Sequence, residues 1–235
     1  MLYEDLIKSV EHVSNTPVLD VRVSPVWTGV KTRNVGISLL YAISHEGVED
    51  AGSLTGKPAK ELLNYLLTFN LTKVSIGLAT LNSLLERPKS YELINALDYI
   101  ESRCENKRVV FVGHFEGLDR IKTKAKELII LERKPQEGDV IDTAYYYLIP
   151  DADIVAITGS AFANKSIESI LSLKRNGETI ILGPSTPPSQ VLFDYGVDVI
   201  GASLVQEGDS LMSVISQGGS KSQFKQYLNY IMLKK

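Results

Sequence analysis

One stretch, residues 108–133, places the strongest constraint on how this chain can fold. Residues 109–112 are a run of β-branched and aromatic side chains, which is typical of a strand buried on both faces. Residues 116–127 are polar enough for a surface helix, and the apolar run at 128–131 indicates a second buried strand. The order of these segments predicts a βαβ unit with two parallel strands.

The same alternation continues along the chain. Apolar runs predict further strands at 154–158, 179–182 and 197–201, and a helix fits between two of them at 166–173. Strands that alternate with helices imply a mostly parallel sheet of the doubly wound type. We therefore expect the larger part of the chain to be an α/β domain.

The first part of the chain has a different pattern and predicts a small α+β domain. Two β-rich runs lie close together in the sequence, which favours antiparallel pairing. In chain order, the expected segments are a helix at 1–14, β-rich runs at 17–31 and 34–43, a loop at 47–56, and helices at 59–69, 72–85 and 91–103. We place the domain boundary so that residues 1–88 form the α+β domain and residues 89–235 the α/β domain.

Composition and charge exclude several classes of protein. A formal net charge of −3 gives no electrostatic reason to expect nucleic acid or an anionic membrane as a partner. The single cysteine, Cys104, excludes an internal disulfide and a Cys-rich metal site within one chain. No apolar run approaches the roughly 20 residues that span a bilayer, and charged residues interrupt any signal-peptide pattern near Met1. We expect a cytoplasmic protein.

Polar segments follow four of the predicted strands in the α/β domain. The carboxyl ends of parallel strands share one edge of a sheet, so these segments should converge there, where α/β folds bind their ligands. The segments are Gly113-His114-Phe115, Glu132, Thr158-Gly159-Ser160 with Asn164, and Gly183-Pro184-Ser185-Thr186.

His114 and Glu132 carry the most reactive groups of these segments. An imidazole on a strand-end loop can transfer protons or bind a metal, so His114 is the candidate catalytic residue; the alternative is a histidine bonded to nearby backbone. Glu132 has the position of the acidic residue that binds ribose in dinucleotide folds, although the glycine pattern of that motif is absent. The alternative for Glu132 is a solvated strand end paired with Arg133 or Lys134. A metal site would have to combine His114, Glu132 and Asp139.

The remaining segments offer hydroxyl groups and backbone amides. Thr158-Gly159-Ser160 can turn sharply and bind an anion, while Asn164 either caps the following helix or contacts the ligand. The prolines around Ser185 and Thr186 hold that loop in one shape, which reduces the entropy cost of binding; a purely structural turn is the alternative.

These segments resemble those of the putative heavy-metal chelation family, formerly a domain of unknown function. The resemblance covers nearly the whole chain and includes Gly77-Leu78-Ala79-x-x-Asn82 and Glu132-x-x-Pro135-x-x-Gly138-Asp139. It implies an N-terminal domain like that of enolase, packed on a Rossmann-like domain, with the site in the cleft between them. It also implies a role in binding or delivering a heavy metal, with Asn82 reaching into the site from the N-terminal domain.

Three hypotheses follow from the sequence. In the first, the interdomain cleft binds a metal or a small anionic, metal-chelating organic ligand, with His114 as a ligand or general acid–base. In the second, the chain is a nucleoside- or S-adenosylmethionine-binding module without chemistry of its own. In the third, it is a scaffold whose strand-end loops are only turns. A homodimer is compatible with both ligand-binding hypotheses, and the sequence leaves open whether the protein is an enzyme.

Overall fold

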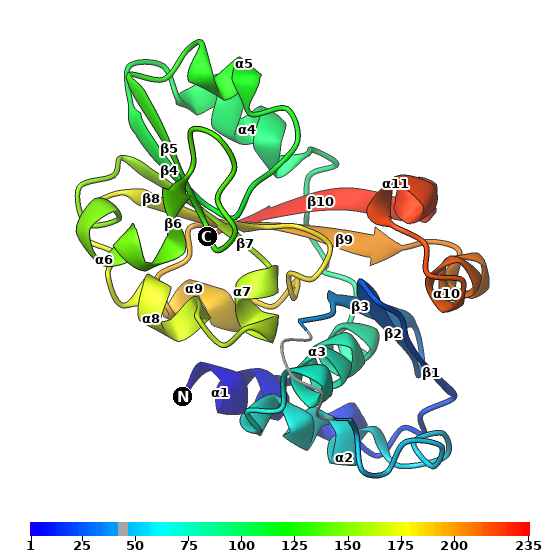
Figure 1. The fold of residues 1–235 in the computed structure, drawn as a ribbon. Helices are drawn as coiled ribbons and strands as arrows, with labels where there is room; N and C mark the ends of the chain where they lie inside the picture. Colours follow the sequence, from blue (N-terminus) through cyan, green and yellow to red (C-terminus); the bar gives the residue numbers. More distant parts are fainter. Residues whose placement is uncertain (42–46) are drawn as a thin grey trace.

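In a computed structural model, the chain folds into a small and a large β-sheet with helices around and between them (Figure 1). The structure describes residues 1–41 and 47–235. The small sheet is an antiparallel meander of β1 (Asp20–Val23), β2 (Trp27–Lys31) and β3 (Val35–Leu39). The predicted antiparallel pairing of the two β-rich runs is thus confirmed, and the end of the second run lies outside the described residues.

Helices cover one face of the small sheet. They are α1 (Leu2–Ser9), α2 (Ala59–Leu63) and α3 (Leu71–Leu84), with the 3₁₀ helices η1 (Glu11–Val13) and η2 (Asn64–Leu67). The long helix α3 packs directly on β3 at Gly36, where an added Cβ would lie 2.1 Å from the Ala79 carbonyl oxygen. Only glycine allows this approach, so Gly36 fixes the distance between helix and sheet.

The large sheet has seven strands in the order β10-β9-β8-β7-β4-β5-β6. All neighbours are parallel except β10, which is antiparallel to β9. The strands are β4 (Arg108–Val112), β5 (Glu127–Glu132), β6 (Val140–Ile141), β7 (Ile154–Thr158), β8 (Glu178–Leu182), β9 (Val199–Val205) and β10 (Leu228–Lys234). The predicted α/β class with a mostly parallel sheet is confirmed.

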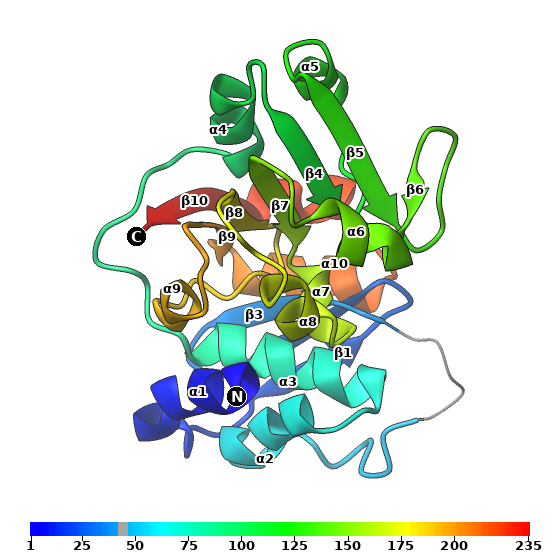
Figure 2. The same ribbon diagram turned by 90° about the vertical axis from the view of Figure 1, so that its left-hand side faces the viewer.

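Helices lie on both faces of the large sheet (Figure 2). One face carries α4 (Ala96–Arg103) and α5 (Asp119–Lys122); the other, which faces the N-terminal part, carries α7 (Ser160–Ala163), α8 (Ile167–Leu171) and α9 (Val191–Asp194). The remaining helices are η3 (Asp142–Ala144), α6 (Tyr145–Leu148), α10 (Gly208–Ser216), α11 (Lys221–Phe224) and η4 (Lys225–Tyr227).

Several predicted boundaries differ from the structure. The helix expected at 116–127 is only the single turn of α5, and the helix expected from 91 begins at Ala96. Strands β6 and β10 were not predicted, because β6 has two residues and β10 pairs with a strand distant in sequence. No described helix is long and apolar enough to cross a membrane.

The two parts of the chain share their hydrophobic core. One cluster of buried side chains runs from Leu2 on α1 through Leu78 on α3 to Val155 and Ile231 in the large sheet. A separate cluster places α10 against the small sheet, on the face opposite α3, where Trp27 packs edge-to-face on Phe224 with ring centroids 5.0 Å apart. The proposed boundary at residue 88 and the likeness of the first part to enolase stay predictions.

Candidate functional site

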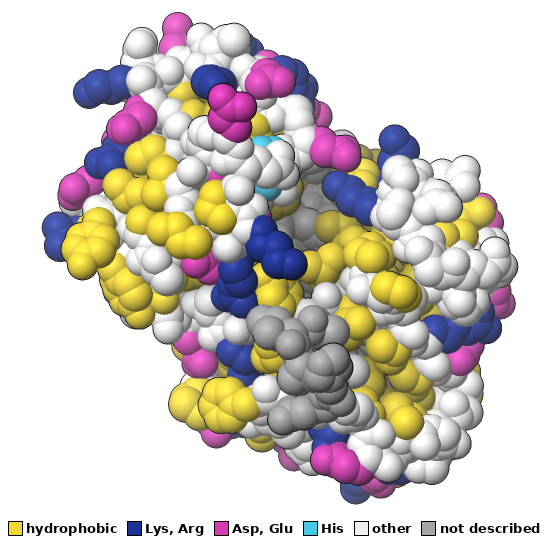
Figure 3. All heavy atoms as spheres, in the orientation of Figure 1, with side chains coloured by type: hydrophobic (Ala, Val, Ile, Leu, Met, Phe, Trp, Pro, Cys, Tyr) yellow, Lys and Arg dark blue, Asp and Glu magenta, His cyan; other side chains and the backbone are white. Residues whose placement is uncertain are grey.

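A pocket of about 510 Å³ lies where the strand-end loops of the large sheet face the small sheet. Its walls include residues from both parts of the chain, with Trp27, Leu39 and Tyr41 from the first. Figure 3 shows a hollow between the two halves, with Lys and Arg side chains and a histidine at its edge. A volume of this size is typical of sites for small organic molecules.

Most of the residues selected from the sequence line this pocket. These are Gly113, His114, Phe115, Glu132, Thr158, Gly159, Ser160, Asn164, Gly183, Pro184 and Ser185. They come from four loops that are far apart in the sequence and meet because β4, β5, β7 and β8 are parallel neighbours. Asn82, Asp139 and Thr186, also selected, do not line it.

The turn after β4 is fixed by a glycine and by the neighbouring strand. Gly113 has φ +99°, and an added Cβ would lie 2.8 Å from the Thr158 side chain, so no larger residue fits here. The backbone N–H of His114 donates to Glu132 Oε2 at 3.0 Å. Glu132 thereby ties the turn after β4 to the end of β5.

The Glu132 carboxylate has backbone partners on both oxygens. Its Oε1 accepts from the backbone N–H groups of Arg133 at 2.7 Å and Lys134 at 3.3 Å, and its Oε2 accepts from that of His114. Glu132 therefore does pair with Arg133 and Lys134, but through their backbone N–H groups and not through their charged side chains. Hydrogen bonds of this kind leave the carboxylate less capacity to bind a metal or a ribose.

His114 is held by a buried carboxylate. Its Nδ1 lies 3.1 Å from Asp139 Oδ2 and 3.3 Å from Oδ1, and the Asp139 side chain is only 2% exposed. Asp139 also accepts from the backbone N–H of Gln136 at 3.1 Å, which completes a turn at Gly138. The alternative of a histidine bonded to backbone is thus wrong for the ring, whose partner is Asp139.

The metal site predicted from His114, Glu132 and Asp139 does not form. Among the described residues, no three His, Cys, Asp or Glu side chains lie together in a group that could hold a metal ion. The physical reason is that backbone N–H groups occupy the Glu132 carboxylate and the His114 ring occupies that of Asp139. Cys104 is fully buried, and burial raises the pKa of its thiol, which disfavours the thiolate that metals bind.

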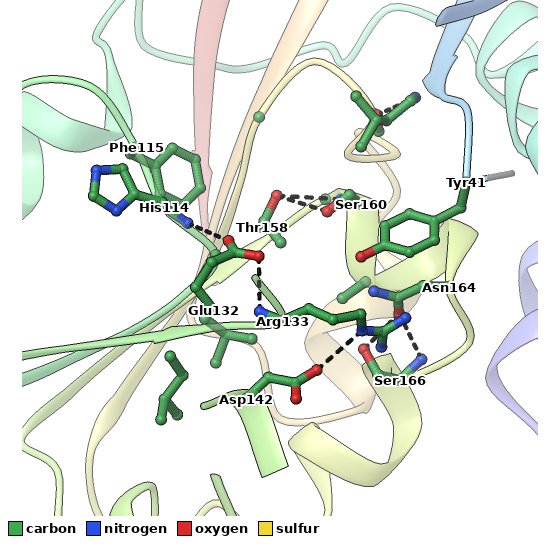
Figure 4. A pocket seen from close by; sticks show the side chains of 18 of the residues that line it. Tyr41, His114, Phe115, Glu132, Arg133, Asp142, Thr158, Ser160, Asn164 and Ser166 are labelled. Atoms are coloured by element: carbon green, nitrogen blue, oxygen red, sulfur yellow. Dashed lines mark hydrogen bonds and ion pairs between the residues drawn. The ribbon is translucent and has the colours of Figure 1, made fainter. Parts of the chain in front are cut away.

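Hydroxyl groups line the pocket at the end of β7. Thr158 Oγ1 and Ser160 Oγ lie 3.1 Å apart, and both point between the β4 turn and Tyr41 (Figure 4). Asn164 Oδ1 accepts from Ser166 N at 3.0 Å and Ser166 Oγ at 2.6 Å, so this oxygen caps the turn before α8. If Asn164 contacts a ligand, it would therefore do so by donating a hydrogen bond from its side-chain nitrogen, Nδ2.

The loop after β8 joins the two parts of the chain. Ser185 Oγ accepts from the backbone N–H of Leu39 at 2.8 Å, and the Ser185 carbonyl accepts from Asn82 Nδ2 at 3.2 Å. Asn82 Nδ2 also donates to the Ile37 carbonyl at 3.0 Å, and Thr186 is 1% exposed. Asn82 and Thr186 thus lie in this junction, and the expectation that they reach into the pocket is not met.

The charged and aromatic wall on the opposite side of the pocket was not predicted from the sequence. Arg133 Nε donates to Asp142 Oδ2 at 3.1 Å, and the guanidinium carbon lies 5.1 Å from the ring centroid of Tyr41 (Figure 4). Tyr145 and Lys221 also line the pocket. Arg133 could have been found as a cation next to Glu132 at a strand end, but Tyr41 and Lys221 reach the pocket only through tertiary contacts.

Two family models match the chain, and both carry the description "Putative heavy-metal chelation"; one covers residues 3–85 and the other residues 95–234. An uncharacterised protein of Methanocaldococcus jannaschii is 23% identical over 206 residues, 84% of this chain and 79% of the relative.

Two crystal structures of proteins with unknown function share the fold, both from the DUF364 family to which the second model belongs. The protein from Desulfitobacterium hafniense is 22% identical and has a TM-score of 0.89, covering 99% of this chain and 97% of its own. The protein from Pyrococcus horikoshii is 16% identical and has a TM-score of 0.88, covering 100% of both chains. With the second model spanning most of the chain, this protein belongs to the family described as "Putative heavy-metal chelation".

Proposed function

We propose that the pocket between the two sheets binds a small organic anion that chelates a heavy metal, so that the protein takes up the metal as part of this ligand. The observation that carries the proposal is the composition of the pocket wall. It combines two cations, Arg133 and Lys221, with hydroxyl groups and four aromatic side chains, and the described residues hold no cluster of metal ligands. Three carboxylates also line the wall: Glu116, Glu132, which accepts from backbone N–H groups, and Asp142, which accepts from Arg133.

The cations are suited to carboxylate or phosphate groups. Arg133 is oriented by Asp142 and stacked on Tyr41, which leaves other guanidinium N–H groups to bind an oxyanion. The hydroxyls of Thr158 and Ser160 lie on the same pocket and can add hydrogen bonds. The aromatic rings of Trp27, Phe115 and Tyr145 offer an apolar surface to the organic part of a ligand.

Calorimetry with free metal and with chelates tests this function. We expect Ni²⁺–citrate or Ni²⁺–nitrilotriacetate to bind the protein, and NiCl₂ alone to bind far more weakly. Arg133→Met should weaken chelate binding at least tenfold because a charge-assisted hydrogen bond contributes roughly 1.5–3 kcal/mol. The matched control, Arg175→Met, removes an exposed arginine outside the pocket and should leave the affinity unchanged. Equal binding by wild type and Arg133→Met would refute the proposed site.

Native mass spectrometry of freshly purified protein offers an independent test. A bound organic molecule together with a metal, detected in one-to-one stoichiometry, supports the proposal. A metal that remains bound after all small organic molecules are removed would contradict it.

A second candidate is a nucleoside- or S-adenosylmethionine-binding module. It is favoured by the place of Glu132 at the end of β5, next to the glycine turn of β4. Against it stand the three backbone N–H groups that already occupy the Glu132 carboxylate. Calorimetry with adenine nucleotides and S-adenosylmethionine separates the two functions, because absence of heat at millimolar ligand would remove this candidate.

A further inference from the structure

We infer that His114 Nε2 is the one protein ligand to the metal of the bound chelate, which it contacts at the edge of the pocket. This inference rests on the proposed function and adds the atom that recognises the metal. It starts from the disagreement between a family described by metal chelation and a chain whose described residues form no three-ligand metal site.

The hydrogen bonds of the imidazole determine which nitrogen is free. The carboxylate oxygens of Asp139 accept hydrogen bonds, so the ring nitrogen 3.1 Å from its Oδ2 is the donor. That nitrogen is Nδ1, and with the ring hydrogen there the lone pair that could bind a metal lies on Nε2. The hydrogen bonds of His114 to other described side chains use only Nδ1 on the ring.

This arrangement is the one that metal-binding histidines require. A histidine that binds a metal almost always donates its second ring N–H to a carboxylate or carbonyl, which fixes the ring orientation and increases the basicity of the ligating nitrogen. Here Asp139 is 2% exposed and is itself held by the Gln136 amide, while the His114 side chain remains 36% exposed. A buried carboxylate thus orients an accessible imidazole.

The position of His114 matches a ligand with two different ends. Figure 4 shows His114 and Phe115 on one side of the pocket, and Tyr41, Asn164 and Ser166 on the other. Arg133 extends toward that second side. A chelate could therefore place its free oxyanion groups against Arg133 and turn an open coordination position of its metal toward His114. Imidazole nitrogen suits metals such as Ni²⁺, Co²⁺, Cu²⁺ and Zn²⁺.

A single imidazole would hold a free metal ion only weakly, so the remaining ligands must come from the organic molecule. This accounts for a metal-binding family member with one buried cysteine and no described cluster of ligands. It also predicts that His114 discriminates between chelates with an open coordination position and chelates that are coordinatively saturated.

Two probes separate the metal contact from the anion contact. Cu²⁺–nitrilotriacetate is anionic and has coordination positions open to imidazole, whereas Co³⁺–ethylenediaminetetraacetate is anionic, inert and saturated. Both are titrated by calorimetry, and the copper complex is also followed by electron paramagnetic resonance. The protein carries His12→Ala and His45→Ala so that His114 is its only histidine.

We expect the copper spectrum to show coupling to one imidazole nitrogen, and His114→Ala to remove this coupling and weaken binding of the copper complex at least tenfold. Binding of the cobalt complex should not change. Asp139→Asn should weaken binding of the copper complex about 10- to 100-fold, the usual effect of losing the carboxylate behind a histidine ligand. Circular dichroism verifies that each variant is folded. Arg133→Met should weaken binding of both complexes, since both carry the oxyanions.

Three outcomes would overturn the inference. A copper spectrum unchanged by His114→Ala, with the cobalt complex still bound in an Arg133-dependent way, would refute the metal contact and leave the proposed function intact. If copper binding depends on His114 but not on Arg133, the complex binds an exposed histidine without using the pocket, and the inference is wrong. Failure of wild-type protein to bind either complex would refute the inference together with the proposed function.

Discussion

At the scale of single residues, the carboxylates of Glu132 and Asp139 organise the site by binding other residues of the chain. Glu132 joins two loops by accepting hydrogen bonds from three backbone N–H groups, and Asp139 orients the His114 ring. The sequence predicted both as metal ligands, and placed Glu132 beside the pocket by its position at a strand end. It could not reveal that backbone amides and an imidazole would occupy them, because those partners depend on the path of each loop in three dimensions.

Replacing Glu132 with Gln should loosen both loops. The amide group of glutamine presents N–H donors to the backbone N–H of either His114 or Arg133, so at least one of these donors loses its acceptor. We expect the free energy of unfolding to fall by about 1 kcal/mol, the usual net value of one hydrogen bond, measured by urea denaturation. Glu137→Gln, at an exposed position in the following loop, is the matched control and should change it by less than about 0.5 kcal/mol. Equal stabilities of the two variants would contradict the assigned role.

Asp50 gives the first part of the chain a specific sensitivity to acid. Its carboxylate accepts from Lys57 Nζ and, at 2.6 Å, from the Tyr65 hydroxyl, and the bond to Lys57 is the main cause that lowers the pKa of Asp50 below 3.8. A carboxyl whose pKa is lower in the folded state stabilises the fold above its unfolded pKa, and this contribution is lost as pH falls through the folded value.

The comparison of wild type with Asp50→Asn tests this effect. Since the Asp50 side chain is 31% exposed, we expect wild type to be more stable by at most about 1 kcal/mol at pH 7. The difference should shrink as the pH is lowered below 3.8. Chemical denaturation from pH 7 to pH 3 measures it, with the exposed Asp151→Asn as control. A difference that stays constant with pH would count against the assigned bonds.

At the scale of helices and strands, the elements that could be predicted are those with local signals. Strand β7 begins and ends where the apolar run does, and α3 follows its asparagine cap at Asn70, whose side chain accepts from Lys73 N at 3.0 Å. Strand β10 was not predicted because a single apolar run cannot show which segments it pairs with. In the structure it pairs with β9 on one side, and its Met232 forms an isolated antiparallel bridge with Glu92. Periodicity also overestimated α5, since a polar segment fits a helix and a loop equally well.

The close packing of α3 on β3 depends on the lack of a side chain at Gly36. In Gly36→Ala, the new Cβ would lie 2.1 Å from the Ala79 oxygen and 2.3 Å from the Ser83 nitrogen, both backbone atoms of α3. The helix must therefore shift, and we expect a loss of about 3 kcal/mol in the free energy of unfolding, at the upper end of the usual range for overpacking. At Gly47 no described atom lies within 4 Å of an added Cβ, so Gly47→Ala should cost under about 0.5 kcal/mol.

At the scale of the whole molecule, the two parts of the chain are joined by a shared hydrophobic core and by hydrogen bonds that are buried or half-buried. The Tyr3 hydroxyl donates to the Phe162 carbonyl at 2.8 Å, Lys165 Nζ donates to the Leu66 carbonyl, and Asn82 bonds to Ser185. The sequence predicted two kinds of architecture along one chain correctly. It did not predict how extensively the two parts pack on each other, because these contacts join residues that are far apart in the sequence.

We therefore expect the protein to unfold in one cooperative step. Differential scanning calorimetry should give a single transition whose calorimetric and van't Hoff enthalpies agree, as for a single cooperative unit. The physical reason is that the main cluster of buried side chains includes Leu2, Leu78, Val155 and Ile231 from both parts. Two separable transitions would show that the shared core contributes little to the coupling.

The helix α10 has a consequence for how the molecule is made. It covers one face of the small sheet, with Leu211, Met212 and Ile215 against Trp27 and Ile37, yet it follows that sheet by most of the length of the chain. On the ribosome, β1 to β3 emerge long before the helix that shields them. The nascent sheet therefore keeps Trp27 and Ile37 uncovered until the residues of α10 have been synthesised.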